Sequence, residues 1–130
     1  MPTSNINLGD AFLLETSNIP HLYVAIAPTE NNKFLLVNLT KRKQRSEIAC
    51  ILLPDRTGMP SFVKVETVIA YWAARSIDDR QLLIDIRKDS PIPYCCFPNN
   101  ILLDIQMGAI NSDEIDPIHK RAVKRLLNIP

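Results

Sequence analysis

The stretch IPHLYVAIAPTENNKFLLVNLTKRKQR, residues 19–45, decides the fold. An apolar run from Leu22 to Ala27 is followed by turn residues from Pro28 to Asn32, and then by a second apolar run from Phe34 to Leu39. Two apolar runs that flank a short polar turn predict a β-hairpin whose strands are buried. The stretch ends in a burst of positive charge, KRKQR, which is either a solvated loop or the edge of a nucleic-acid site.

Further strands are expected on both sides of this hairpin. Gly9-Asp10 opens a first strand over Ala11–Glu15, and Ile48–Leu53 is a third apolar run between polar segments. The segment Ser61–Tyr71 alternates in part between apolar and polar residues, which is typical of a strand with one buried face. Asp78-Asp79 is expected to begin a turn or a helix rather than to bind a metal.

The C-terminal third predicts helices. A short helix over Ile101–Met107 is expected to be capped by Asn99 or Asn100 and to stop at Gly108. A last helix begins near Ser112 or at Asp116-Pro117, because proline is favoured at the first helical position. Its apolar residues recur at helical spacing along one stripe: Ile118, Ala122, Val123, Leu126 and Leu127.

Length and composition are consistent with a single domain. The chain has 130 residues, of which 46% are hydrophobic, so a packed core is expected. Strands followed by helices predict an α+β fold, with a small β-barrel over residues 8–90 and a helical segment over 99–130. A formal net charge of +1 gives no global attraction to nucleic acid or membranes, so any phosphate binding must come from a local cluster.

The cysteines and the N-terminus bear on localisation. No apolar run approaches the length of a membrane span, and MPTSNINLGD lacks the basic and apolar regions of a signal peptide. The three cysteines, Cys50, Cys95 and Cys96, form a poor disulfide framework and fit a reducing cytoplasm. Cys95 and Cys96 are expected to be small buried apolar residues. With two histidines and no CxxC pair, neither a metal nor a cofactor is expected.

The order of several short motifs resembles the PemK/MazF-like toxins. GDAFLLE, PHLYVAIAP and KFLLVNLT look like the opening of that family, and Asn38-Leu39-Thr40, Cys50-Ile51-Leu52 and the segments 60–63 and 67–71 look like a divergent branch of it. The match covers roughly residues 8 to 77. The resemblance implies an SH3-like barrel and a metal-independent endoribonuclease of a type II toxin–antitoxin system. It also implies RNA as substrate, a cognate antitoxin as partner and a homodimer.

Two departures from the family pattern concern its catalytic residues. The arginine of the family falls near Pro20-His21, where this chain has none, and the place of a histidine in the divergent branch is taken by Gly58-Met59. The resemblance therefore implies the fold more strongly than the activity. The alternative is a non-catalytic barrel of the same ancestry that binds nucleic acid or a protein partner.

Three residues are candidates for RNA cleavage, which needs a base, an acid and a cation. His21 can be the base or the acid, since its ordinary pKa lies near physiological pH. Arg56 can neutralise the phosphorane, and Thr67 matches the family's hydroxyl residue by order. Each also has a structural interpretation: a surface histidine, a solvated arginine and a packed threonine.

The basic cluster comprises Lys41, Arg42, Lys43 and Arg45, which are candidates for nucleic-acid binding. A second basic set lies on the last helix, at Lys120, Arg121, Lys124 and Arg125. Few aromatic residues are available to stack on bases, and of these Trp72 is expected in the core. The apolar stripe of the last helix is expected to pack on the barrel, or else to dock a partner or a second copy of the chain.

Overall fold

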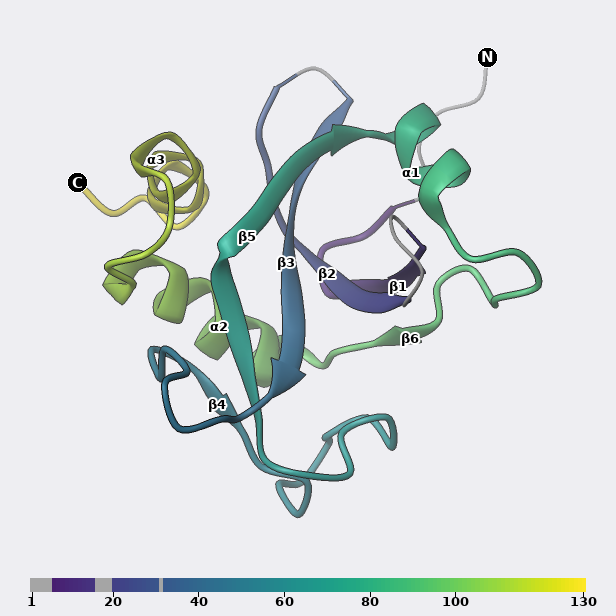
Figure 1. Ribbon diagram of the computed structural model, residues 1–130. Helices are drawn as coiled ribbons and strands as arrows, with labels where there is room; N and C mark the ends of the chain where they lie inside the picture. The colour runs from purple at the N-terminus through teal and green to yellow at the C-terminus, as the bar shows by residue number, and fades with distance from the viewer. Residues whose placement is uncertain (1–5, 16–19, 31) are drawn as a thin grey trace.

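The computed structural model describes residues 6–15, 20–30 and 32–130, and it shows an α+β protein built on one antiparallel sheet. Six strands pair in the order β4-β5-β3-β2-β1-β6, and the sheet curls in the manner of a half-barrel (Figure 1). The predicted class, a small barrel with C-terminal helices, is compatible with this arrangement. Residue 31, in the expected hairpin turn, lies outside the described residues.

The hairpin of β2 (His21–Pro28) and β3 (Lys33–Lys41) forms as predicted. It lies at the centre of the sheet, between β1 (Asp10–Leu14) and β5 (Thr67–Asp78). Because side chains alternate along a strand, Leu22 and Val24 of β2 point to one core cluster, while Tyr23 points to another. The continuous apolar run therefore reflects burial on both faces of the sheet.

Each face of the sheet has its own covering helices. The cluster that contains Leu22 and Val24 also contains residues of α2 (Asn99–Asn111) and α3 (Pro117–Leu126), so we call this side the α2–α3 face. The cluster that contains Tyr23 includes Leu82 of α1 (Asp79–Asp85), so the opposite side is the α1 face. In Figure 1, α1 and the pair α2 and α3 accordingly lie on different sides of the central strands.

The long strand β5 is irregular in its middle. Asn38 of β3 pairs with Ala70, but Leu36, two residues earlier, pairs with Arg75, so residues 71–74 stand opposite Val37 alone. Extra residues on one strand bend it locally and change where its later side chains point. Trp72 lies in this irregular part and is 70% exposed, so the expectation of a core tryptophan is wrong.

The ends of the helices follow local capping chemistry. Asp78 caps α1 by accepting a hydrogen bond from the amide of Gln81 at 2.8 Å, which confirms the predicted helix start. Asp116 caps α3 in the same way, with Pro117 at the first position, as expected. Two expectations for α2 are wrong. Gly108 does not stop the helix, which continues to Asn111. Neither asparagine caps it, because it begins at Asn99 directly after Pro98.

Two edge strands differ from the prediction. The expected strand over Ile48–Leu53 is reduced to β4 (Ile51–Leu52), which pairs only with the first two residues of β5. A further short strand, β6 (Cys95–Cys96), pairs with β1 in a segment that also contains Pro91, Pro93 and Pro98. These two short strands form the two edges of the sheet, and its four central strands are unaffected.

Candidate functional site

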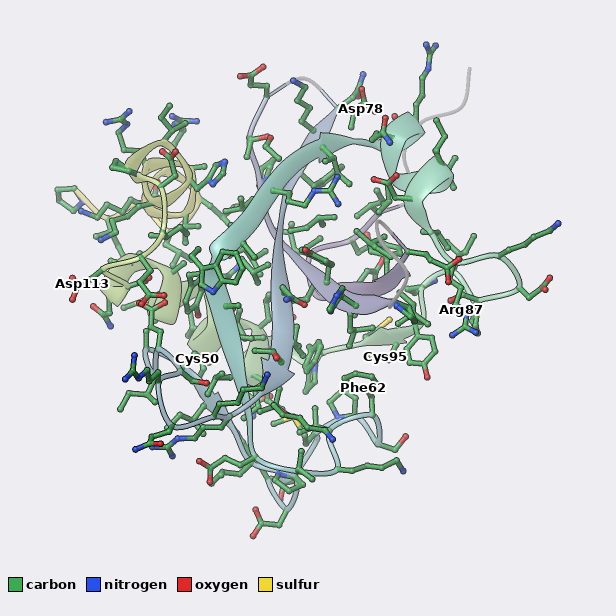
Figure 2. All side chains as sticks on the ribbon, in the orientation of Figure 1. Cys50, Phe62, Asp78, Arg87, Cys95 and Asp113 are labelled. Atoms are coloured by element: carbon green, nitrogen blue, oxygen red, sulfur yellow. The ribbon has the colours of Figure 1, made fainter. Side chains whose placement is uncertain are left out.

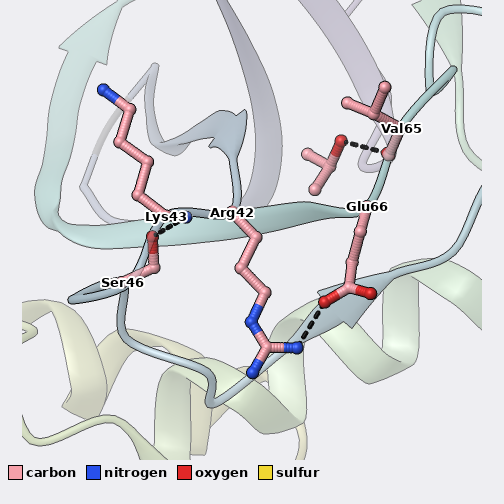
Figure 3. A network of polar contacts seen from close by, with 6 residues as sticks. Arg42, Lys43, Ser46, Val65 and Glu66 are labelled. Carbon is pink, nitrogen blue, oxygen red and sulfur yellow. Dashed lines mark hydrogen bonds and ion pairs between the residues drawn. The ribbon is translucent and has the colours of Figure 1, made fainter.

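The basic loop after β3 is ordered by a few polar contacts (Figure 3). The guanidinium of Arg42 forms an ion pair with Glu66, and the amide of Arg42 donates to the Glu66 carbonyl at 3.1 Å. Lys43 and Ser46 close a tight turn through the Lys43 amide and the Ser46 hydroxyl, 2.8 Å apart. Arg42 is thus already engaged with a carboxylate.

Three of the four predicted nucleic-acid-binding residues remain available. The side chains of Lys41, Lys43 and Arg45 are exposed, and no ion pair is seen for them within the described residues. Exposed cations without a carboxylate partner can neutralise phosphates with little rearrangement. The loop therefore has the charge that an RNA backbone needs, but this charge carries no sequence information by itself.

The loop is joined to the basic helix α3 through a polar junction. Glu47 accepts hydrogen bonds from the Ser112 hydroxyl at 2.6 Å and from the Asp113 amide at 3.2 Å. Lys120 in turn donates to the Ser112 carbonyl at 2.8 Å. Figure 2 shows Asp113 where α2 gives way to α3. The two basic segments, far apart in the sequence, therefore meet at this junction.

Thr67 lies at the start of β5 and points to the α2–α3 face. It is 5% exposed and pairs with Lys41 and Leu52 in the neighbouring strands. Its hydroxyl donates a hydrogen bond to the Val65 carbonyl at 2.9 Å. Two residues later on the same strand, Ile69 belongs to the core cluster of this face. The Thr67 hydroxyl is thus used within the turn that leads into β5.

Arg56 also lies toward α2. It follows β4 in a turn, and its guanidinium is 2.5 Å from the carboxylate of Asp104 on α2. Both side chains are partly exposed, so the pair is a surface ion pair of modest strength. A phosphate that approached Arg56 would have to compete with this carboxylate.

His21 stands apart from Thr67 and Arg56. It opens β2 and pairs with Leu14 of β1, whose side chain belongs to the core cluster of the α1 face. Directly opposed residues of paired strands point to the same face, so His21 points to the α1 face as well. Of the three predicted catalytic residues, only His21 thus lies on the α1 face, while Thr67 points to the α2–α3 face and Arg56 lies toward α2.

The α1 face instead gathers four polar side chains on neighbouring strands, which we call the α1-face cluster: His21, Tyr23, Asn38 and Arg75. Tyr23 lies two residues after His21 and pairs directly with Asn38. The Arg75 guanidinium carbon lies 5.9 Å from the centroid of the Tyr23 ring, a cation–π distance. The cluster therefore combines an imidazole, a phenol, an amide and a guanidinium.

Helix α1 holds the arginine of this cluster in place. Asp85 accepts from Arg75 at 3.2 Å, and the other Asp85 oxygen accepts from the side-chain amide of Gln81 at 2.9 Å. Asp85 is largely buried and Arg75 about one-third exposed. The guanidinium is consequently oriented over Tyr23 while part of it still faces solvent.

Asn38 is the least satisfied member of the α1-face cluster. Its side chain is 9% exposed, and its Oδ1 atom is buried with no hydrogen-bond partner within the described part of the chain. A buried polar group without a partner destabilises the folded state by about 1–3 kcal/mol. A buried polar group without a partner calls for an explanation, and one explanation is a ligand that binds to it.

Sequence reasoning considered Tyr23 only as an aromatic residue that could stack on bases, and it assigned no site role to Asn38 or Arg75, although Tyr23 and Asn38 left a signal. Tyr23 follows His21 at the spacing of two that places strand residues on one face. Asn38 is the one polar residue inside the run FLLVNL of β3. Arg75 left no signal in the sequence, because the face to which it points depends on the irregular pairing of β5 with β3.

The α2–α3 face has a hollow of about 270 Å³ beside Cys50, Asp104 and Gly108. Burial, and then the charge of Asp104, raises the pKa of the Cys50 thiol to about 11, so this thiol is neutral at physiological pH. Burial likewise raises the pKa of Tyr71, whose hydroxyl donates to the Ile105 carbonyl at 2.6 Å. Neither group is activated as a nucleophile.

The adjacent cysteines differ in exposure. Cys95 is partly buried, and burial raises its pKa to about 11. Cys96 is exposed, so the expectation that both are buried is wrong for this residue. Its thiol donates to Asp10 at 3.2 Å, and this bond is the main reason that the pKa of Cys96 is raised. Figure 2 shows Cys50 beside α2 and Cys95 on β6.

The described ranges contain neither a metal site nor a membrane-spanning helix. There, no group of three or more His, Cys, Asp or Glu side chains is placed to hold a metal ion. No helix among these residues is both long and apolar enough to cross a bilayer. Compared with known proteins, the chain matches no family model and no curated sequence.

Proposed function

We propose that this protein is a PemK/MazF-like endoribonuclease of the toxin–antitoxin kind, which cleaves single-stranded RNA without a metal at the α1-face cluster. The observation that carries the proposal is that His21, Tyr23 and Arg75 share one face of the sheet. The sequence resemblance and the curled sheet, interpreted as an SH3-like barrel, support the same assignment. The proposal includes a cytoplasmic homodimer that a cognate antitoxin neutralises.

The cluster contains the groups that a metal-independent cleavage needs. His21 takes the proton of the ribose 2′-hydroxyl, and the resulting oxygen attacks phosphorus to form a 2′,3′-cyclic phosphate. Arg75 neutralises the charge on the phosphorane, and the Tyr23 hydroxyl gives its proton to the departing 5′-oxygen. After the reaction, the proton on His21 returns to the Tyr23 oxygen through water.

The spacing of these groups suits one phosphodiester. Strand residues rise about 3.3 Å each, so the Cα atoms of His21 and Tyr23 are about 6.6 Å apart on one face. The Arg75 guanidinium lies over the Tyr23 ring. The base, the acid and the cation are thus within reach of one bridging phosphate. Arg56 and Thr67 have structural roles in this proposal.

The test is cleavage of a labelled single-stranded RNA by purified protein in the presence of a chelator. We expect His21→Ala and Arg75→Ala each to reduce the rate by about 100-fold or more, which is typical for loss of a general acid, a base or a charge stabiliser. His119→Ala and Arg56→Ala are the matched controls, and we expect them to keep the wild-type rate, because His119 lies on α3 and Arg56 contacts Asp104 of α2, both away from the cluster.

Three results would count against this assignment. Loss of cleavage in Arg56→Ala, with His21→Ala unaffected, would move the site to the α2–α3 face. A chelator-sensitive reaction would contradict a metal-independent mechanism. Wild-type protein that is folded by circular dichroism and binds RNA, but cuts none, would exclude catalysis.

A non-catalytic RNA-binding barrel is the second candidate. It is favoured by the engagement of Arg75 with Asp85 and Tyr23, which leaves this cation less free to follow a changing phosphate. The exposed cations Lys41, Lys43 and Arg45 suit backbone binding without cleavage. Binding of intact RNA with a steep salt dependence, and no products, would favour this function.

A further inference from the structure

Asn38 occupies a position where an apolar residue would be expected from packing alone. It lies inside the central strand β3, between Val37 and Leu39, which both belong to the core cluster of the α2–α3 face. Its Oδ1 atom has no partner in the described structure, and its side chain is nine-tenths buried. Since the amide weakens the fold where it stands, its presence suggests a ligand that completes its hydrogen bonds.

The side chains next to Asn38 decide how a ligand could reach it. Its two cross-strand partners are Tyr23 and Ala70, and Ala70 contributes only a methyl group to this face. The Tyr23 ring is covered by the Arg75 guanidinium. Tyr23 is 7% exposed and the Oδ1 atom of Asn38 is buried, so a ligand reaches them only after a phosphate has drawn Arg75 away from Asp85 and from the Tyr23 ring.

We propose that Asn38 reads an unpaired adenine of the bound RNA. An asparagine amide can pair with adenine through two hydrogen bonds, with Oδ1 accepting from the exocyclic amino group and Nδ2 donating to a ring nitrogen. Single-stranded RNA presents such base edges, and an unstacked base can lie on an aromatic ring such as that of Tyr23. This inference rests on the proposed function only in taking RNA as the ligand.

The test compares two nonamers, one of nine uridines and one in which the central uridine is replaced by adenosine. Both are made of 2′-fluoro RNA, which lacks the hydroxyl needed for cleavage. Fluorescence anisotropy at one fixed salt concentration gives the affinities. We expect the wild-type protein to prefer the adenosine oligomer by about tenfold, within the usual range for one bidentate base contact. Asn38→Leu should bind the two oligomers equally and melt at the same or a higher temperature.

Two further variants complete the design. Asn111→Leu changes an exposed asparagine at the end of α2 and should keep the preference. Asn38→Asp, which keeps an acceptor and loses the donor, should reduce the preference, and it serves as the test if Asn38→Leu does not fold.

Four outcomes would contradict the inference or its premise. Equal binding of the two oligomers by the wild type would overturn the inference while RNA binding stands. A preference that survives in Asn38→Leu, or a clear drop in its melting temperature, would overturn it too. Wild-type protein that binds neither oligomer would instead contradict the proposed function.

Discussion

Replacement of Gly108 by alanine tests how α2 packs against the sheet. Gly108 is buried in the last turn of α2, where a Cβ atom would overlap the Tyr71 hydroxyl and lie 2.8 Å from the Cβ of Cys50. The carbonyl oxygen of Ala49 would be only 3.1 Å away. The helix can approach β5 this closely only because position 108 has no side chain. We therefore expect Gly108→Ala to push the helix and the sheet apart.

The size of the effect follows from three opposing contributions. Alanine is favoured over glycine in a helix interior by about 1 kcal/mol. Overpacking a well-packed core costs about 1–3 kcal/mol. Displacing the Tyr71 hydroxyl from the Ile105 carbonyl, 2.6 Å away, costs about 1 kcal/mol more. The unfavourable contributions win, so we expect a destabilisation of about 1–3 kcal/mol and a fall in melting temperature of roughly 4–12 °C.

Urea denaturation followed by circular dichroism measures this change in the free energy of unfolding. Tyr71→Phe removes the hydroxyl that the new methyl group would meet, so the double variant should lose less than the two single losses combined. If Gly108→Ala instead unfolds at a higher urea concentration than the wild type, helix propensity alone decides the outcome. The close packing of Gly108 against Tyr71 would then be refuted.

Other predictions concern pH, capping and the predicted catalytic hydroxyl. Burial raises the pKa of Cys50 from 9.0 to about 11, so the stability gained from keeping this thiol protonated is lost as pH rises from about 9 to 11. Thermal melts of Cys50→Ala should show a flatter decline over that window, and an unchanged decline would contradict the burial. Asp116→Ala removes the cap on the Ile118 amide and should lower the free energy of unfolding by about 1 kcal/mol; a loss below 0.3 kcal/mol in urea melts would show that the cap matters little. Thr67→Val removes the bond to the Val65 carbonyl and should destabilise by about 1 kcal/mol while RNA cleavage continues; an abolished rate would restore Thr67 as catalytic.

The centre of the sheet could be predicted because its residues satisfy local and global requirements together. The run from Leu22 to Ala27 is apolar at both parities, so any strand pairing that covers both faces of the sheet suits it. Helix α3 likewise carries a cap, a first-turn proline and an apolar stripe, of which Ala122 and Val123 are buried while Ile118 is exposed. Except at Ile118, the apolar pattern that predicts the strand or helix also predicts which of its side chains are buried.

The predictions failed where a distant residue decides the outcome. Gly108 looks like a helix stop, because glycine often ends helices, but its role is to let Tyr71 approach α2. Trp72 looks like a core residue, but the irregular pairing of residues 71–74 places it in solvent. Neither the approach of α2 nor the register of β5 leaves a pattern in the nearby sequence.

For the candidate site, too, some features could be predicted from local spacing and others depend on distant residues. The parity of β2 places His21 and Tyr23 on one face, and this much could be predicted from their spacing. That Arg56 and Thr67 point to the other side depends on the strand order, in which β5 pairs with both β3 and β4. Motif order along the chain cannot distinguish the two faces of a sheet, because one residue of shift exchanges them.

The basic loop, with which the hairpin stretch ends, is compatible with a site on either face. Leu22 pairs with Leu39, so the beginning of β2 and the end of β3 lie side by side at the same end of the hairpin. The exposed cations of the loop therefore follow directly from the strand end next to His21, and they also meet α3 through the Glu47 junction. Changing Lys43 or Arg45 should weaken RNA binding and lower its salt dependence wherever the reacting phosphate lies. Loop variants thus test whether RNA binds, and only the comparison of His21→Ala with Arg56→Ala tests on which face it reacts.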